Sequence, residues 1–257
     1  MGDIILSTAA FCLWDIEPIE KLKITKDLKF NDIQIALSTE KMLRNFLEYL
    51  NNSLEIDSFQ KISIHAPWCG VTYGENDKTE RILEYLLKVS NIINIDIILF
   101  RVDCIRDINP IIKSGLPICL ENSNKKGCWR KFRSIAEKHD FPLALNINRA
   151  LRGDDYLDDF IAEYGSRIER ILISGYDSNN GRMPLLLAKQ LHLLEKIKEI
   201  KAPLVLDGLF EPGDREGIIK ERYLVKEYIK HINDNESPDI TMRNDLFSDA
   251  LKEPWDN

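Results

Sequence analysis

The stretch that best indicates the fold lies at residues 116–123 and reads Leu-Pro-Ile-Cys-Leu-Glu-Asn-Ser. A proline lies near its start, apolar residues follow, and the chain turns polar at Glu121. A short apolar run bounded by turn-forming residues predicts a buried parallel strand. A buried carboxylate is costly without a partner, and ligands of parallel sheets gather at the carboxyl ends of the strands. Glu121 is therefore the leading candidate for a functional residue.

Seven further segments have the character of a strand, and helical segments alternate with them along the chain. The predicted strands are residues 3–7, 32–37, 61–67, 95–102, 116–121, 142–147, 168–174 and 202–206, and the main predicted helices are 39–50, 76–92, 129–138, 156–164, 184–200 and 218–231. This alternation implies parallel strands with right-handed crossovers. Eight such units in 257 residues predict a single-domain α/β fold, the closed (β/α)₈ TIM barrel. A doubly wound open sheet is the alternative, weakened because no Gly-x-Gly-x-x-Gly follows a predicted strand.

Composition and charge limit the kinds of partner that we expect for this protein. The barrel is predicted over residues 1–231, and residues 232–257, with seven acids and two bases, are predicted as an acidic tail packed on or trailing from it. The formal net charge of −7 does not favour nucleic acid as a partner, and a membrane is not expected as one either. No apolar run has the length of a membrane span. Five cysteines without zinc-ribbon spacing predict reduced thiols in a cytoplasmic protein.

Polar residues follow most of the predicted strands, where a closed barrel would bring them to one mouth. They are His65, Asp103, Glu121, Asn122, Asn146, Asn148, Arg149, Ser174, Asp177 and Asp207. Basic residues in the following loops, Lys125, Lys126 and Arg182, add positive charge beside them. Such charge is suited to attracting a phosphate or carboxylate group, although a solvated helix face is the alternative for basic residues further along.

Five short motifs occur in order at the ends of predicted strands. They are Ile-His-Ala-Pro at 64–67, Leu-Glu-Asn at 120–122, Leu-Ala-Leu-Asn-Ile-Asn-Arg at 143–149, Ile-Ser-Gly-Tyr-Asp at 173–177 and Leu-Val-Leu-Asp-Gly at 204–208. In these motifs the chain resembles the xylose isomerase-like TIM barrel superfamily, in particular its sugar phosphate isomerase and epimerase group. That superfamily also contains metal-dependent abasic-site endonucleases.

The resemblance implies a divalent-metal site built from a glutamate, an aspartate, two histidines and a second glutamate. Glu121 keeps the first position, and the other four are held by Asn146, Arg149, Ser174 and Asp207. An amide is a weaker ligand for a hard cation than an ionised carboxylate, and serine is a poor replacement for imidazole. We therefore expect a degraded metal site, at which Mn²⁺ or Mg²⁺ binds weakly or not at all through Glu121, Asn146 and Asp207.

Two functions remain open at this point. In the first, the protein is an isomerase- or epimerase-like enzyme that moves a proton on a small, phosphorylated or carboxylated hydroxy-carbonyl compound. Glu121 and Asp207 would be its acid–base pair and His65 would orient the substrate. The residues expected to bind the substrate are Arg149, Asn122, Asn148, Lys125, Lys126, Arg182 and Asp177.

In the second, the barrel is catalytically degenerate and binds a ligand or a protein without turnover. An ion pair between Glu121 and Arg149 that fills the mouth would favour this alternative. His65 as a packed core histidine and Asp207 as a turn former are the purely structural interpretations.

Overall fold

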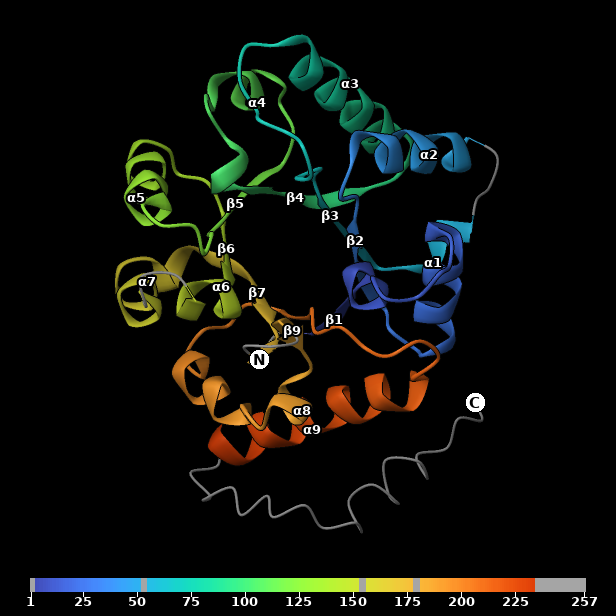
Figure 1. The fold of residues 1–257 in the computed structure, drawn as a ribbon, viewed down its shortest axis with the longest axis vertical. Helices are drawn as coiled ribbons and strands as arrows, with labels where there is room; N and C mark the ends of the chain where they lie inside the picture. The colour runs from blue at the N-terminus through green and yellow to red at the C-terminus, as the bar shows by residue number, and fades with distance from the viewer. Residues whose placement is uncertain (1–2, 52–54, 153–155, 178–180, 234–257) are drawn as a thin grey trace.

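The computed structural model describes residues 3–51, 55–152, 156–177 and 181–233. Eight parallel strands close into a barrel in the order β1-β10-β7-β6-β5-β4-β3-β2 (Figure 1). Their bounds are Ile4–Ser7 (β1), Asp32–Ala36 (β2), Lys61–His65 (β3), Ile95–Arg101 (β4), Ile118–Glu121 (β5), Leu143–Asn146 (β6), Ile168–Ile173 (β7) and Leu204–Leu206 (β10). The predicted single-domain (β/α)₈ barrel is confirmed, and the open sheet is excluded because β1 pairs with both β2 and β10.

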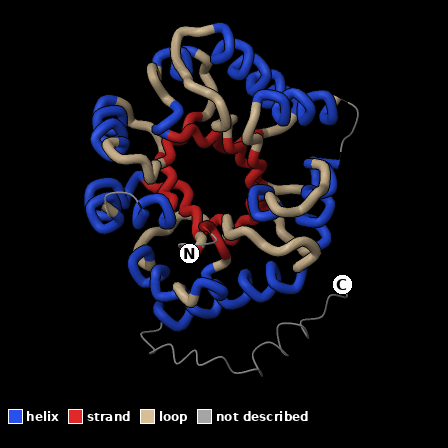
Figure 2. The backbone as a smooth tube through the Cα atoms, viewed as in Figure 1, coloured by secondary structure: helices blue, strands red, loops and turns tan. Residues whose placement is uncertain are grey.

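Helices surround the ring of strands on the outside (Figure 2). The α-helices are α1 (Pro18–Asp27), α2 (Glu40–Leu50), α3 (Asp77–Ile92), α4 (Asn109–Lys113), α5 (Cys128–Lys138), α6 (Ile147–Arg152), α7 (Leu157–Tyr164), α8 (Leu185–Ala188) and α9 (Arg215–Asn233). The 3₁₀ helices are η1 (Thr8–Phe11), η2 (Glu55–Ser58), η3 (Val102–Cys104), η4 (Gly165–Arg167) and η5 (Leu191–Ile197). Side-chain caps begin two of the longer helices: Thr39 accepts the N–H of Met42 at 3.1 Å, and Asn76 accepts that of Thr79 at 3.0 Å.

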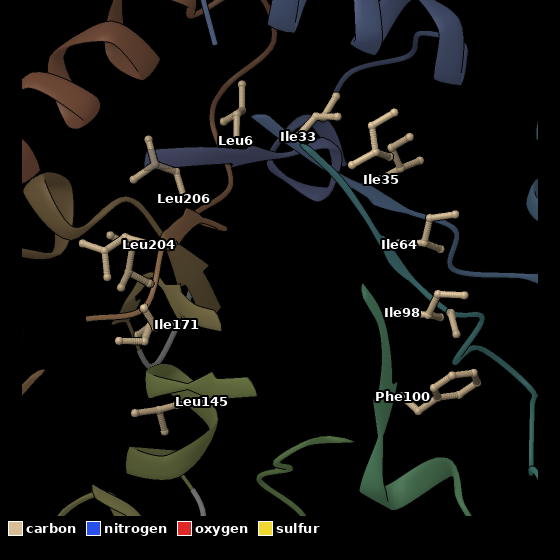
Figure 3. Packing of buried hydrophobic residues seen from close by; sticks show 14 of the residues in the cluster. Leu6, Ile33, Ile35, Ile64, Ile98, Phe100, Leu145, Ile171, Leu204 and Leu206 are labelled. Carbon is tan, nitrogen blue, oxygen red and sulfur yellow. The ribbon is translucent and has the colours of Figure 1, made fainter. Parts of the chain in front are cut away.

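Two apolar layers hold the barrel together, because successive residues of a strand face opposite sides of the sheet. In Figure 3 the labelled side chains, among them Ile33, Ile64 and Leu204, point away from the barrel axis toward the helices. A smaller cluster fills the inside of the barrel, and its members are Ile5, Ile97, Leu99, Cys119, Ala144, Leu172 and Val205. No member of this inner cluster comes from β2 or β3.

The prediction of one continuous helix over residues 184–200 is wrong. The segment instead forms the short α8, a left-handed residue at Lys189 with φ 56°, and the 3₁₀ helix η5. Directly after the break, the Gln190 side chain binds both backbone groups of Tyr176, at 2.9 and 3.1 Å. Tyr176 belongs to a two-stranded hairpin, β8 (Gly175–Asp177) and β9 (Gly181–Met183), that the sequence pattern did not predict.

Two other boundaries differ from expectation. Helix α6 begins directly after β6, so Asn148 and Arg149 lie on a helix rather than in a loop. Helix α9 continues to Asn233, so the boundary predicted at residue 232 falls within a helix, and residues 234–257 lie outside the described residues. In the part of the chain that the structure describes, no helix combines the length and apolar character that crossing a membrane requires.

Candidate functional site

Glu121 lies at the carboxyl end of β5 and is fully buried, and three side chains surround its carboxylate. Its Oε1 accepts a hydrogen bond from Asn146 Nδ2 at 3.0 Å and lies 3.0 Å from Arg149 Nη1. Its Oε2 lies 2.8 Å from His65 Nε2. The contacts with Arg149 and His65 are electrostatic, because neither N–H is aligned for a hydrogen bond to a described residue. Both oxygens of Glu121 are therefore already in contact with positively polarised groups of the protein.

These neighbours fix the protonation state of Glu121. Burial alone would raise the pKa of this carboxyl, but Arg149, His65 and Arg101 hold the pKa well below its usual range. Burial also lowers the pKa of the Arg149 guanidinium, and Glu121 opposes that effect. An arginine retains its charge under such conditions. The pair is thus ionic, and a carboxylate with so low a pKa is a weak proton acceptor.

Asn122 and Asn148 hold the ends of neighbouring elements together. Asn122 Oδ1 accepts the N–H of Asn146 at 2.6 Å, while its Nδ2 donates to the carbonyl of Asn146 at 3.1 Å. The same Nδ2 lies 3.2 Å from the hydroxyl of Tyr156, which donates to the carbonyl of Ser123. Asn148 Nδ2 donates to the carbonyl of Gly175 at 2.8 Å. Both amides, predicted to bind substrate, therefore position the backbone around the site.

A second ion pair lies across the barrel end from β9 to β10. Arg182 Nη1 contacts Asp207 Oδ2, and its Nη2 lies 3.5 Å from the carbonyl of Ala9. The other oxygen of Asp207, Oδ1, has no hydrogen-bond partner within the described residues, although the residue is buried. Asp177, at the end of β8, is half-buried and pairs in register with Gly181.

A third charged group lies beyond β4. Arg101 binds Asp103 through two hydrogen bonds, at 3.1 and 2.9 Å, and Lys125 Nζ lies 3.0 Å from the same carboxylate. Burial would lower the pKa of Arg101, but Glu121 and Asp103 raise it. Lys126 is exposed. Across the three groups, four basic side chains (Arg101, Lys125, Arg149, Arg182) face three acidic ones (Asp103, Glu121, Asp207), which leaves an excess of one positive charge, His65 not counted.

The residues present do not fit the divalent metal that the resemblance implies. Arg149 brings a positive charge to 3.0 Å from Glu121 Oε1, where a cation ligand set needs a free oxygen. Asp207 already binds Arg182 through one oxygen. Among the described residues, no group of three or more His, Cys, Asp or Glu side chains could hold a metal ion. Arg149 is therefore the cation that accompanies Glu121 in this fold.

Unpartnered polar atoms are concentrated in this part of the molecule. In the described residues, nine buried side-chain nitrogen or oxygen atoms form no hydrogen bond. Eight of the nine belong to inward-facing or mouth residues, namely Gln34 (two atoms), His65, Glu121, Arg149, Arg170, Ser174 and Asp207. The atoms of His65, Glu121 and Arg149 are nevertheless in the ion-pair contacts given above. A buried polar atom without a partner is costly, so such atoms mark places where a polar ligand can be recognised.

The structure thus brings together most of the predicted site. Glu121, His65, Asn146 and Arg149 share direct contacts, and Asp207 pairs with Arg182. Two residues of the barrel end were not predicted: Arg101 and Trp68, whose ring lies 4.5 Å from that of His65. Gln34, a buried inward residue in the middle of β2, was not predicted either. A signal for Gln34 was present, since it is the polar residue between Ile33 and Ile35 and so shares the inward phase of its strand.

Comparison with known proteins identifies the class of fold. No protein-family model and no curated protein matches the chain. A D-tagatose 3-epimerase-like protein has a TM-score of 0.64 at 13% identity, over 91% of this chain and 99% of that one. A xylose isomerase-like TIM barrel/4-hydroxyphenylpyruvate dioxygenase fusion protein has 0.58 at 15%, over 93% of this chain and 45% of that one. An AP endonuclease, family 2, from Brucella melitensis has 0.56 at 9%, over 85% and 97%.

The chain therefore has the fold of the xylose isomerase-like TIM barrels, and the predicted resemblance is confirmed at the level of fold. Its structural neighbours include sugar epimerase-like and endonuclease barrels. Within this class of fold, the chain is a variant that has an ion pair between Glu121 and Arg149 at the barrel mouth.

Proposed function

We propose that the carboxyl end of the barrel binds a small hydroxylated compound that carries a phosphate or carboxylate group, and that it does so without a divalent metal. The single observation that carries this proposal is the Arg149 guanidinium. It is mostly buried, with 14% of the side chain exposed, it is charged and lies beside Glu121, and its buried Nη1 has no aligned acceptor among the described residues. A guanidinium in that state is suited to a ligand oxyanion.

The surrounding charges support an anionic ligand. The three charged groups at the mouth have one positive charge in excess, in a chain whose formal net charge is −7. A local positive potential on an acidic protein attracts small anions and repels polyanions that contact the wider surface. The imidazole of His65 lies in the same region, with Nε2 2.8 Å from Glu121 Oε2 and its ring tilted by 33° against that of Trp68.

A second function, proton transfer of the isomerase or epimerase kind, is favoured by a different observation. Asp207 has one buried oxygen, Oδ1, without a partner among the described residues, while Arg182 holds the other. That oxygen could accept a proton from a carbon next to a carbonyl, with Arg149 facing the developing enediolate. Glu121 is the weaker candidate for this step because its pKa is held so low.

Titration calorimetry with inorganic phosphate and D-fructose 6-phosphate tests the first proposal. We expect both to bind the wild-type protein after metal removal with a chelator, and both to be lost in Glu121→Gln/Arg149→Met, which removes the two charges together. Arg44→Met is the matched control, because Arg44 lies on the exposed face of α2. Wild-type protein that binds neither anion, or only after Mn²⁺ is added, would contradict the proposal.

Proton exchange in D₂O tests the second. Deuterium entering D-fructose 6-phosphate next to its carbonyl, in wild type and not in Asp207→Asn, would establish turnover. Binding without exchange would leave the protein as a binding barrel.

A further inference from the structure

A groove lies on the outside of the barrel, between α8 and the first turns of α9, which pack against each other (Figure 1). Its volume is about 420 Å³. The apolar side chains that line it are Pro184, Leu186, Leu187 and Phe210, and α9 contributes Gly217 and Glu221. None of Arg149, Arg182 and Asp207 lines it, so the groove is separate from the candidate site at the barrel mouth.

Leu187 gives this groove an apolar surface that is open to water. It has an exposed fraction of 59%, the largest among the exposed large apolar side chains of the described residues. Phe210, which lines the same groove, is buried and belongs to the apolar core. A single exposed leucine is ordinary, but an apolar wall that joins the core and lines a groove is typical of a surface that another segment covers.

Residues 234–257, which follow α9 in the sequence, contain apolar residues at helical spacing. Leu246, Phe247 and Leu251 recur at intervals of one and four residues, and Trp255 follows after four more. This spacing is typical of the apolar face of a surface helix, which Pro254 would end just before the tryptophan. Such a face needs an apolar surface on which to pack.

The end of α9 lies within reach of the groove. Glu221 and Asn233 are separated by about 18 Å along α9, at a rise of about 1.5 Å per residue. The sequence Asn-Glu-Ser-Pro at 235–238 is rich in turn-forming residues. A reversal of the chain there, followed by a path antiparallel to α9, brings Leu251 level with Glu221 and Trp255 one turn further along the groove.

Charge favours the same path. Residues 234–257 contain seven acidic and two basic residues, whereas α9 contains five basic and three acidic ones. Lys226 and Lys230 of α9 are exposed, as is Lys189 beside the groove. Opposite charges on two neighbouring segments guide their approach and fix their register. The apolar contacts would then supply most of the free energy of packing.

We propose that residues 246–255 pack into this groove on the same chain, with Leu251 and Trp255 against Leu187. The proposal does not depend on the proposed function, because the groove and the candidate site share no residue. Helix α8 follows shortly after β9, the strand that carries Arg182. The packed segment therefore holds α8, and with it the hairpin that carries this arginine, against α9.

Fluorine NMR of the full chain labelled with 5-fluorotryptophan tests the proposal. The chain has four tryptophans, and the Trp255 signal is the one that disappears in Trp255→Phe. We expect Trp255 to be shielded from water in wild type, so its signal should shift little between H₂O and D₂O. In Leu187→Asp and in Leu251→Asp, the shift should rise to that of the urea-unfolded protein. Leu87→Asp is the matched control and should leave the signal unchanged, because Leu87 is an exposed leucine of α3, on the opposite side of the ring in Figure 1.

Every other outcome overturns the proposal. A Trp255 signal that is fully solvent-sensitive in wild type shows that the segment does not pack, and it leaves the groove to another protein. A shielded Trp255 that either variant fails to release shows that the segment packs elsewhere, and release by Leu87→Asp as well shows that the loss is not specific to the groove. A shift that changes on dilution, together with a dimer in sedimentation velocity, shows that the segment packs on a second copy of the chain.

Discussion

Arg149 Nη1 lies 3.0 Å from Glu121 Oε1, so an arginine occupies the side of the carboxylate at which the resemblance implies a metal. The arginine reaches this position because α6 begins directly after β6, which places Arg149 three residues beyond Asn146 on the first turn of a helix. Asn146 Oδ1 accepts the N–H of Arg149 at 3.2 Å and so fixes this turn. The positive charge beside Glu121 is thus supplied by a side chain of the protein, Arg149.

The ion pair between Glu121 and Arg149 should make a large and coupled contribution to stability. We expect Glu121→Gln and Arg149→Met each to lower the free energy of unfolding by about 3 kcal/mol, because each leaves a buried charge without its partner. The double variant should lose less than the sum, with a coupling above about 1 kcal/mol in a urea-denaturation cycle. The exposed pair Arg44 and Glu48, cycled in the same way, should couple by less than about 0.5 kcal/mol. Additive losses at the buried pair would contradict the prediction.

Metal affinity should be recoverable on this scaffold. The triple variant Asn146→Asp, Arg149→His and Ser174→His removes a positive charge, adds a carboxylate and supplies two imidazoles. We expect calorimetry to show tight Mn²⁺ binding by this variant and weak or no binding by wild type. Adding Glu121→Gln to the triple variant is the control and should abolish the gain. Micromolar Mn²⁺ binding by wild type would show that our interpretation of these positions is wrong.

The protein should not cleave abasic DNA by a multi-zinc mechanism, although one structural neighbour is an AP endonuclease. Of the four histidines, only His65 lies at the barrel end, while His139 ends α5, His192 lies on η5 and His231 on α9. Several zinc ions would need several imidazoles. The measurement is nicking of an abasic duplex with added Zn²⁺. Zinc-dependent nicking that disappears in His65→Ala would overturn the prediction.

Glu221 should make stability depend on pH near neutrality. Its carboxylate accepts the N–H groups of Leu185 at 2.6 Å and Leu186 at 3.1 Å, yet burial raises its pKa to about 7 from an ordinary 4.5. A pKa raised in the folded state favours the proton there, so the stabilisation is complete below 4.5 and is lost as the pH rises through 7.

The size of this effect follows from the same shift. Relative to Glu221→Gln, the free energy of unfolding of wild type should fall by up to about 3 kcal/mol across this window. Urea denaturation of both proteins at a series of pH values measures the difference. A difference that is flat or rises with pH would contradict the assignment.

The fold could be predicted because the apolar runs and helical segments alternate with little interruption. Closure of the barrel then places Glu121, His65, Asn146 and Asp207 at one end, as expected. Arg182 was expected beside the mouth, but its hairpin and its ion pair with Asp207 could not be predicted, since the strands Gly-Tyr-Asp and Gly-Arg-Met have no apolar alternation. Their pairing depends on contacts between distant segments, such as that of Gln190 with Tyr176, which no local pattern encodes.

Two glycines, Gly175 and Gly208, limit which substitutions related sequences can contain near the barrel mouth. A Cβ at Gly208 would lie 2.6 Å from Pro184 N, and one at Gly175 would lie 2.2 Å from the Cβ of Ala188. Any side chain at either position would push the chain after Arg182 off the strand ends that it covers. In related sequences, a Ser-Gly pair at 174–175 and an Asp-Gly pair at 207–208 should therefore be inherited together with an arginine at 182, and the three should be lost together. Sequences of this fold without an arginine at 182 should vary more freely at both glycines, so an alignment of related sequences would test the dependence.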